Sequence, residues 1–297
     1  MKIAIFGASS AISKDLIINF TKYNPDFKLH LFARNKSILE EWLNNNNILK
    51  NIKTINDYEA FVLNRKFDVV MNFVGIGDPT KLIKIGKDII SITNHYDDLV
   101  IKYLKKNIKT KYIFMSSGIV EHKEVNQSKR SENHYLTAKL NAEKKHRLMK
   151  NLSIVDLRIF NYISKTINLN SSFFITDIFN AVINKKVFKT SSLNIYRDFV
   201  GSNDFYRLIL CAIEYSSPIN MSIDCYSKSH TDKISILEML NLNFNLKYEF
   251  NDNLDFDSPS GEKIKYYSRK RNGGVIGFTP SYSSLDTISL ELKRLIL

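Results

Sequence analysis

Short apolar runs alternate with amphipathic segments along the first half of the chain. The runs are rich in β-branched and aromatic residues, as is typical of strands buried on both faces of a parallel sheet. The segments between them carry apolar residues at helical spacing. This alternation predicts an α/β fold built on a doubly wound parallel sheet. The expected strands are residues 2–6, 28–33, 51–55, 67–75, 111–115 and 153–161, and the longest expected helix is 81–104.

The first apolar run ends at a turn made of small residues. Gly7 is followed by alanines and serines and then by a helical segment. A strand, a small-residue turn and a helix N-terminus form the context that a dinucleotide pyrophosphate needs. Only the first glycine of the usual three-glycine fingerprint is present, since Ser10 and Ser13 replace the others, and an ordinary βα unit is the alternative interpretation. The expected cofactor contacts in this turn are Gly7, Ser9, Ser10, Ala11 and Ile12.

The second run ends at a basic residue, Arg34, with Lys36 close behind it. An NAD site usually has an acidic residue at this point to hold the ribose hydroxyls. An arginine favours a 2′-phosphate, so we expect NADP(H), with NAD(H) still possible; a surface arginine at a strand end is the alternative. Asp57, after the third run, is a candidate contact for the adenine.

The pattern becomes less regular after residue 161. Helices are expected over 171–184 and 204–215, and strands over 195–200, which should rejoin the sheet, and 221–225. We therefore expect residues 1–161 to form a Rossmann-type dinucleotide-binding domain to which 191–215 returns. Residues 162–190 and 216–297 should form a smaller C-terminal substrate-binding lobe.

The candidate chemistry lies after the fifth run. Ser116 and Ser117 end this strand, and Tyr135 and Lys139 follow with a spacing that places both on one helix face. A lysine ammonium beside a phenol favours the phenolate, which would let the tyrosine exchange a proton near neutral pH. A serine hydroxyl can hold a carbonyl or alcohol oxygen, so the group suits carbonyl–alcohol interconversion.

Composition and charge limit the classes of partner that we expect. The chain has a net charge of +13, but its lysines are scattered and no arginine-rich arm is present, so we expect no nucleic-acid partner. The basic segment 263–271 could reach a nucleotide, although a solvated face is the simpler interpretation. Two cysteines without metal spacing favour a reducing cytoplasm and no metal site. The N-terminal run is too short for a signal peptide, and no apolar stretch is long enough to span a membrane.

The order of these motifs resembles the extended short-chain dehydrogenase/reductases that act on nucleotide sugars. The resemblance rests on the Gly7 turn and on five further segments. They are Asn72-Phe73-Val74-Gly75, Ser117 with Tyr135-x-x-x-Lys139, Leu157-Arg158-Ile159-Phe160-Asn161, Arg197-Asp198-Phe199 with Asp204, and Ile276-Gly277-Phe278-Thr279-Pro280 with Leu285.

The resemblance implies a role for each matching residue. Tyr135 would donate or accept the proton, Lys139 would lower its pKa and hold the nicotinamide ribose, and Ser117 would bind the reacting oxygen, with Ser116 as its less favoured neighbour. Two further residues, Asn161 and Arg197, would meet the sugar-nucleotide diphosphate. The cofactor contacts after the fourth strand would be Phe73, Val74 and Gly75.

The residues after Ser117 narrow the reaction that the resemblance implies. They are Gly118-Ile119-Val120, so the Asp-Glu pair of dehydratases and the cysteine of epimerising reductases are missing. We expect an NADPH-dependent reductase of a nucleotide-linked 4-keto-6-deoxy hexose or heptose, of the kind used for surface polysaccharide. A 4-epimerase with tightly held NAD and a non-catalytic dinucleotide-binding sensor are the alternatives. Relatives often form homodimers, which we expect here too.

Overall fold

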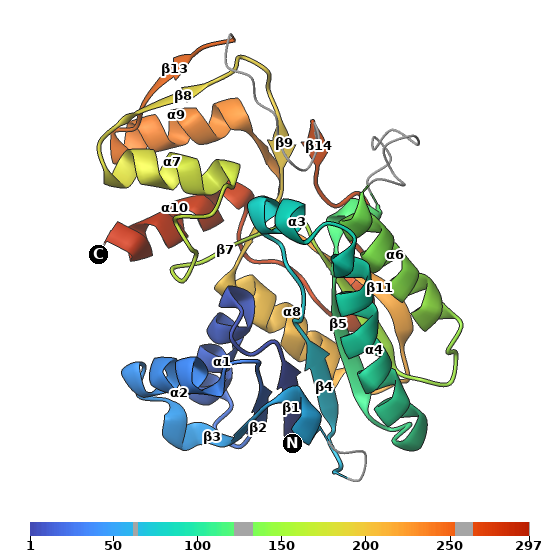
Figure 1. The fold of residues 1–297 in the computed structure, drawn as a ribbon. Helices are drawn as coiled ribbons and strands as arrows, with labels where there is room; N and C mark the ends of the chain where they lie inside the picture. The colour runs from blue at the N-terminus through green and yellow to red at the C-terminus, as the bar shows by residue number, and fades with distance from the viewer. Residues whose placement is uncertain (62–64, 122–132, 253–263, 297) are drawn as a thin grey trace.

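The structure, a computed structural model, describes residues 1–61, 65–121, 133–252 and 264–296. A seven-stranded parallel sheet in the order β3-β2-β1-β4-β5-β6-β11 forms its centre, which confirms the predicted α/β class (Figure 1). Its strands are β1 (Lys2–Phe6), β2 (Lys28–Phe32), β3 (Ile52–Asn56), β4 (Val69–Asn72), β5 (Lys111–Ser117), β6 (Ile154–Ile159) and β11 (Asn220–Cys225).

Helices cover both faces of the sheet. Because side chains alternate along a buried strand, Ile3 and Ile5 of β1 face one helical layer while Ala4 and Phe6 face the other. The first layer contains α1 (Ala11–Tyr23), α2 (Lys36–Asn45) and α8 (Ser202–Glu214). The second contains α4 (Asp88–Lys106) and α6 (His134–Arg147), which pack against each other (Figure 1).

The prediction of one continuous helix over 81–104 is wrong, because the helix is interrupted. The structure has two helices, α3 (Pro79–Ile85) and α4, with Gly86 between them. Gly86 has a φ of 54°, a left-handed conformation that glycine adopts without strain and that interrupts the helix.

A smaller part of the molecule packs around its own apolar core, which includes Phe179, Leu240 and Leu292. It lies beyond the carboxyl ends of the sheet strands (Figure 1). Its helices are α7 (Phe174–Ile183), α9 (Lys233–Phe244) and α10 (Ser284–Ile296). Its strands, and those that join it to the sheet, are β7 (Asn161–Ile163), β8 (Val187–Thr190), β9 (Tyr196–Arg197), β10 (Phe199–Gly201), β12 (Thr231–Asp232), β13 (Lys247–Phe250) and β14 (Lys265–Tyr266).

Two strands differ from their predicted places. Residues 195–200 do not rejoin the sheet: β9 pairs with β12 and β14, and β10 pairs with β7. Strand β11, expected in the lobe, instead lies at the edge of the central sheet beside β6. Helix α8 does cover the sheet, as predicted, through Phe205 and Leu208.

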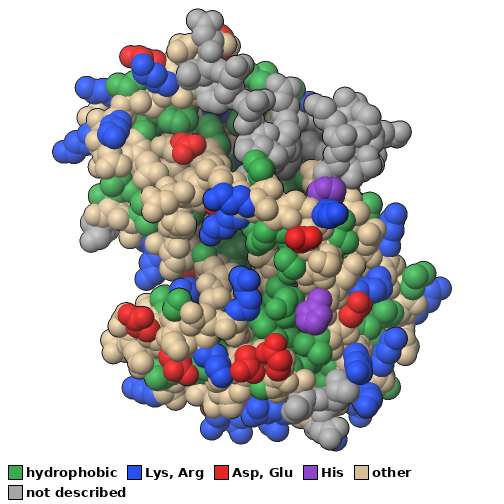
Figure 2. Space-filling view, viewed as in Figure 1, with side chains coloured by type: hydrophobic (Ala, Val, Ile, Leu, Met, Phe, Trp, Pro, Cys, Tyr) green, Lys and Arg blue, Asp and Glu red, His purple; other side chains and the backbone are tan. Residues whose placement is uncertain are grey.

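Charged side chains are spread over the surface. On the face shown in Figure 2, Lys and Arg side chains are scattered over both parts of the molecule rather than gathered in one patch. No helix in the described ranges has the length and apolar character needed to cross a bilayer.

Candidate active site

Helix α6 brings Tyr135 and Lys139 to the carboxyl edge of the sheet. The helix begins directly after Asn133, whose Oδ1 accepts a hydrogen bond from the Leu136 N–H at 2.9 Å and so caps the first turn. Lys139 is buried, and its Nζ donates to the Met115 carbonyl at 2.7 Å. The same Nζ lies 5.8 Å from the centre of the Tyr135 ring. The predicted spacing therefore does place both side chains together.

Ser117 meets these residues from the end of β5. Burial raises the pKa of Tyr135, and a hydrogen bond with Ser117 opposes that rise. Burial is the larger of the two causes, so the net shift is upward. The expectation that Lys139 lowers the pKa of Tyr135 stays a prediction. The three predicted catalytic residues nevertheless converge on one point.

The charge of Lys139 depends on residues beneath it. Burial lowers its pKa to about 8, and the negative charges of Asp97, Asp156 and Glu143 oppose that fall. These carboxylates come from α4, β6 and α6, which the sheet topology brings together. None of the three was predicted as a site residue, because nothing in their local sequence shows that they share a buried cluster.

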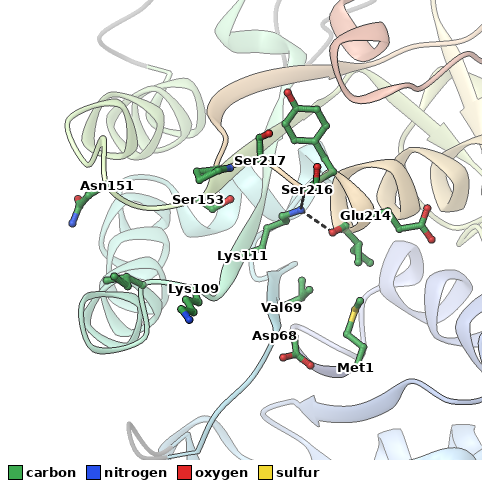
Figure 3. A pocket seen from close by; sticks show the side chains of 14 residues that line it. Met1, Asp68, Val69, Lys109, Lys111, Asn151, Ser153, Glu214, Ser216 and Ser217 are labelled. Carbon is green, nitrogen blue, oxygen red and sulfur yellow. Dashed lines mark hydrogen bonds between the residues drawn. The ribbon is translucent and has the colours of Figure 1, made fainter.

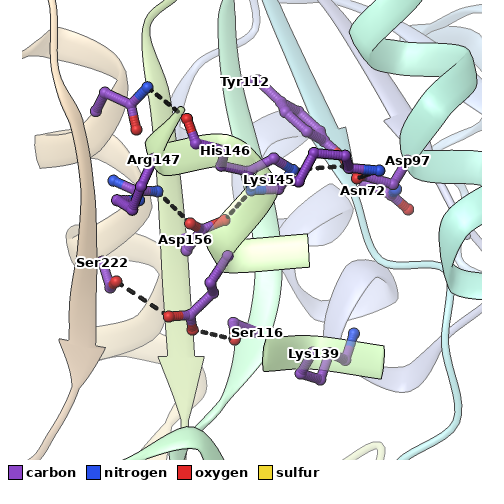
Figure 4. A network of polar contacts seen from close by, with 12 residues as sticks. Asn72, Asp97, Tyr112, Ser116, Lys139, Lys145, His146, Arg147, Asp156 and Ser222 are labelled. Atoms are coloured by element: carbon purple, nitrogen blue, oxygen red, sulfur yellow. Dashed lines mark hydrogen bonds and ion pairs between the residues drawn. The ribbon is translucent and has the colours of Figure 1, made fainter. Parts of the chain in front are cut away.

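Ser116 points away from this group. Its Oγ donates to Glu143 Oε1 at 2.5 Å, and Glu143 also accepts a hydrogen bond from Ser222 (Figure 4). Arg158 Nε donates to the same carboxylate. Successive residues of a strand face opposite sides of the sheet, so Ser117 faces the site while Ser116 is bound beneath α6. The structure does not bring Ser116 to the site as a substrate contact.

The turn after β1 is tight and lies against the backbone of the turn after β4. Gly7 has a φ of 69°, and a Cβ there would lie 2.7 Å from the Phe73 carbonyl carbon. Ser10 has a φ of −71° and caps α1, so this position does not need a glycine. Ser13 is buried and donates to the Gly7 carbonyl at 2.8 Å. The two serines therefore preserve the turn, and the first turn of α1 carries no acidic residue that would repel phosphate.

Other predicted cofactor residues line the same edge. Ser9 and Ala11 are exposed and Ile12 is half-buried. After β4, Phe73 is buried, and the Val74 N–H donates to Asn72 Oδ1 at 2.9 Å. A Cβ on Gly75 would lie 3.5 Å from Lys139 Nζ, which places this turn directly beside the lysine.

The two basic residues after β2, Arg34 and Lys36, differ in their contacts. Arg34 is exposed and, within the described ranges, makes no ion pair. Lys36 Nζ lies 3.1 Å from Asp57 Oδ2, and Asp57 also caps the short helical turn at Ala60. Arg34 is thus available for a phosphate, whereas Lys36 and Asp57 are paired with each other.

Strands of the smaller part of the molecule carry the two predicted substrate contacts and one residue that reaches Ser117. Asn161 Nδ2 donates to the Asp198 carbonyl at 2.9 Å, and Arg197 donates to the Tyr196 carbonyl at 2.8 Å. Tyr266, opposite Arg197 in the β14–β9 pair, places its hydroxyl 3.3 Å from Ser117 Oγ. Sequence reasoning missed Tyr266; its only signal was its place in the basic segment 263–271, of which residue 263 lies outside the described ranges.

A hollow of about 560 Å³ lies at the opposite, amino edge of the sheet (Figure 3). Its central cation, Lys111, donates to the carbonyls of Ala212, Ile213 and Tyr215, each at 2.7 Å, and so closes the end of α8. Ligands of doubly wound folds bind at the carboxyl edge, so this hollow does not belong to the candidate site.

Comparisons with solved structures agree with the fold. The UDP-glucuronic acid 4-epimerase of Bacillus cereus, solved with UDP-glucuronic acid and NAD, is 18% identical, with 99% of each chain covered and a TM-score of 0.77. The UDP-N-acetylglucosamine 4-epimerase of Methanobrevibacter ruminantium is 19% identical, with 99% of this chain and 96% of that chain covered and a TM-score of 0.77. The ADP-L-glycero-D-manno-heptose-6-epimerase of Helicobacter pylori is 17% identical, with the same coverage and a TM-score of 0.75.

These likenesses concern the fold, and no curated protein sequence matches significantly. The family is shown by a sequence model of the NAD dependent epimerase/dehydratase family, which matches residues 3–223. That range includes the Gly7 turn, Ser117, Tyr135 and Lys139. The chain belongs to the NAD dependent epimerase/dehydratase family.

Proposed function

We propose that the protein is a nicotinamide-dependent oxidoreductase that acts on the C4 position of a nucleotide sugar, and that it reduces a 4-keto-6-deoxy hexose or heptose. The observation that carries this proposal is the convergence of Ser117, Tyr135 and Lys139 beside the Gly7 and Gly75 turns. The absence of a paired Asp-Glu or a cysteine directly after Ser117 supports a single hydride transfer and a single proton transfer.

Each residue of the site has a distinct task in this proposal. The nicotinamide cofactor supplies the hydride when it is bound. Ser117 Oγ holds the sugar oxygen, Tyr135 gives that oxygen its proton, and the Lys139 cation stabilises the phenolate that remains. Asn161 and Arg197 are proposed to hold the diphosphate of the substrate.

The cofactor is proposed to be NADP(H), because Arg34 is exposed and unpaired among the described residues at the place where a 2′-phosphate would lie. A reductase must release its cofactor after each turnover, which fits a site that opens to solvent at Ser9 and Ala11. We further propose a homodimer that works in the cytoplasm and supplies sugars for surface polysaccharide.

A 4-epimerase with NAD is the second candidate. It is supported by the two solved 4-epimerases, whose chains match this one over almost their whole length. The two functions differ in cofactor use. An epimerase regenerates its NAD within each cycle, so the nucleotide should copurify and survive dilution, whereas a reductase should consume NADPH in proportion to product.

The test uses purified protein, NADPH or NADH, and a panel of UDP- and dTDP-linked 4-keto-6-deoxy sugars. Loss of nicotinamide absorbance and formation of the alcohol, followed by NMR, would support the reductase. The matching UDP-sugar epimers with catalytic NAD test the second candidate. Tyr135→Phe should lower kcat by roughly 10²- to 10⁴-fold. The control, Tyr206→Phe, removes a hydroxyl that α8 directs to Asn24 and should leave kcat unchanged.

Equal rates for Tyr135→Phe and the native protein would refute the catalytic assignment. Nucleotide binding without turnover of either substrate panel would favour a dinucleotide-binding sensor instead.

A further inference from the structure

A buried hydrogen-bonded chain begins at the turn after β4. Asn72 is almost fully buried, and both ends of its side-chain amide are engaged. Its Oδ1 accepts from the Val74 N–H at 2.9 Å, and its Nδ2 donates to the Tyr112 hydroxyl at 3.0 Å. With one partner at each end, the amide has one orientation, and the backbone of the turn is held by it.

Tyr112 connects Asn72 to residues of helices α4 and α6. Its hydroxyl donates to Asp97 Oδ1 at 2.9 Å, and the same oxygen lies 2.9 Å from His146 Nε2. His146 Nδ1 lies 2.7 Å from Asp156 Oδ1 on β6. Tyr112, Asp97, His146 and Asp156 are all fully buried, and Figure 4 shows most of this chain of contacts.

The two ends of this chain meet at the candidate site. At one end the turn places Gly75 beside Lys139, since a Cβ on Gly75 would lie 3.5 Å from Lys139 Nζ. At the other end His146 belongs to α6, the helix that also carries Tyr135 and Lys139. The chain therefore connects the turn and the helix that have to keep one spacing if a ligand is to contact both.

We infer that the chain Asn72–Tyr112–Asp97–His146 is a positioning device that fixes the 73–75 turn against α6 so that both can contact the nicotinamide cofactor. The inference rests on the proposed function, because that proposal assigns the turn to the cofactor. The Tyr112 hydroxyl is the central link, because among the described residues it connects the amide of Asn72 to the carboxylate of Asp97. Without it, Asn72 is free to rotate and the Val74 N–H loses its fixed acceptor.

A pair of matched tyrosine variants tests this role. Tyr112→Phe removes the hydroxyl that connects Asn72 to Asp97. Tyr103→Phe removes another fully buried hydroxyl from the same core, one that accepts from the Phe67 N–H at 2.8 Å before β4 begins. Binding of NADPH and of NADH is measured directly by nicotinamide fluorescence, without any sugar substrate, and folding is followed by circular dichroism and Tm.

Tyr112→Phe is expected to raise the Kd of the preferred nucleotide about tenfold, the equivalent of one net hydrogen bond, whereas Tyr103→Phe should leave it within about twofold. Both variants should lose similar amounts of Tm. In turnover assays, KM for the cofactor should rise more than kcat falls. If Tyr112→Phe does not fold, Asn72→Leu, which removes both hydrogen bonds of the amide, should show the same tenfold weakening.

Equal Kd values for the native protein and Tyr112→Phe, or equal weakening by both tyrosine variants, would overturn the positioning role while leaving the proposed function intact. Failure of the native protein to bind either nucleotide would overturn both.

Discussion

The stability of the protein should depend on pH through His146. This side chain is completely buried between Asp156 and Asp97. Burial disfavours its charged form, but the hydrogen bonds and charges of the two carboxylates outweigh burial and raise the pKa of His146 from 6.5 to about 9. The folded protein therefore binds a proton that the unfolded chain releases near neutral pH.

The size of the effect follows from this shift. A difference of one pKa unit corresponds to about 1.4 kcal/mol, so His146 should contribute about 3 kcal/mol to the free energy of unfolding. Because the folded pKa is the higher one, the contribution is fully present below pH 6.5 and is lost as the pH rises through 9.

Lys139 acts in the opposite direction. Its folded pKa of about 8 lies below its ordinary value of 10.5, so its titration stabilises the protein as the pH rises between these values. Because native protein and His146→Gln both contain Lys139, most of its contribution cancels in the difference between them. Urea unfolding at pH 6 and pH 9.5 should show a native-minus-variant difference that is about 3 kcal/mol larger at pH 6. A difference that is the same at both pH values would show that His146 is not protonated in the folded protein.

Two further predictions concern a contact and a ligand preference. Gly118→Ala would place a Cβ 2.3 Å from the Phe160 ring and should lower the free energy of unfolding in urea by about 1–3 kcal/mol. The control is Gly274→Ala, whose Cβ would have nothing within 4 Å and which should cost less than about 1 kcal/mol. Equal losses of stability in the two variants would refute the packing argument. Arg34→Asp should weaken NADPH binding more than NADH binding in fluorescence titrations, and an unchanged preference would remove Arg34 from the cofactor site.

The sequence predicts the central sheet well because buried parallel strands form continuous apolar runs whose ends are marked by small or polar residues. Strand β1 is found at the predicted residues 2–6, and the strand predicted over 111–115 is found as β5, which continues to Ser117. The pattern is less informative where pairing is not local. Strand β11 has the composition of any short strand, and only its register with β6 assigns it to the sheet.

The sequence patterns miss Tyr266 and Asp97 for the same reason, because their contacts are not local. Tyr266 reaches Ser117 across 149 positions of sequence, and Asp97 reaches His146 across 49. Neither contact leaves a periodic or spaced signal, because each depends on how separate elements pack rather than on one helix or strand. For the serines of the Gly7 turn, the sequence suggests a weakness that the structure does not show. The loss of two glycines suggests a weakened turn, yet the backbone at Ser10 has an ordinary φ, and the Ser13 hydroxyl adds a hydrogen bond inside the turn.

The electrostatics of Lys139 change the meaning of the Tyr-x-x-x-Lys spacing. The spacing alone implies that a lysine beside a tyrosine carries a charge, but burial at this depth drives a lysine toward its neutral form. Asp97, Asp156 and Glu143 oppose that tendency from beneath the helix, so the cation is maintained by carboxylates that never touch the reacting atoms. In the proposed reaction, proton transfer at Tyr135 would therefore depend on the buried acidic cluster as well as on the two residues that the motif contains. A neutral substitution in that cluster should shift the alkaline limb of the pH–rate profile to lower pH, because Lys139 would then lose its proton more easily.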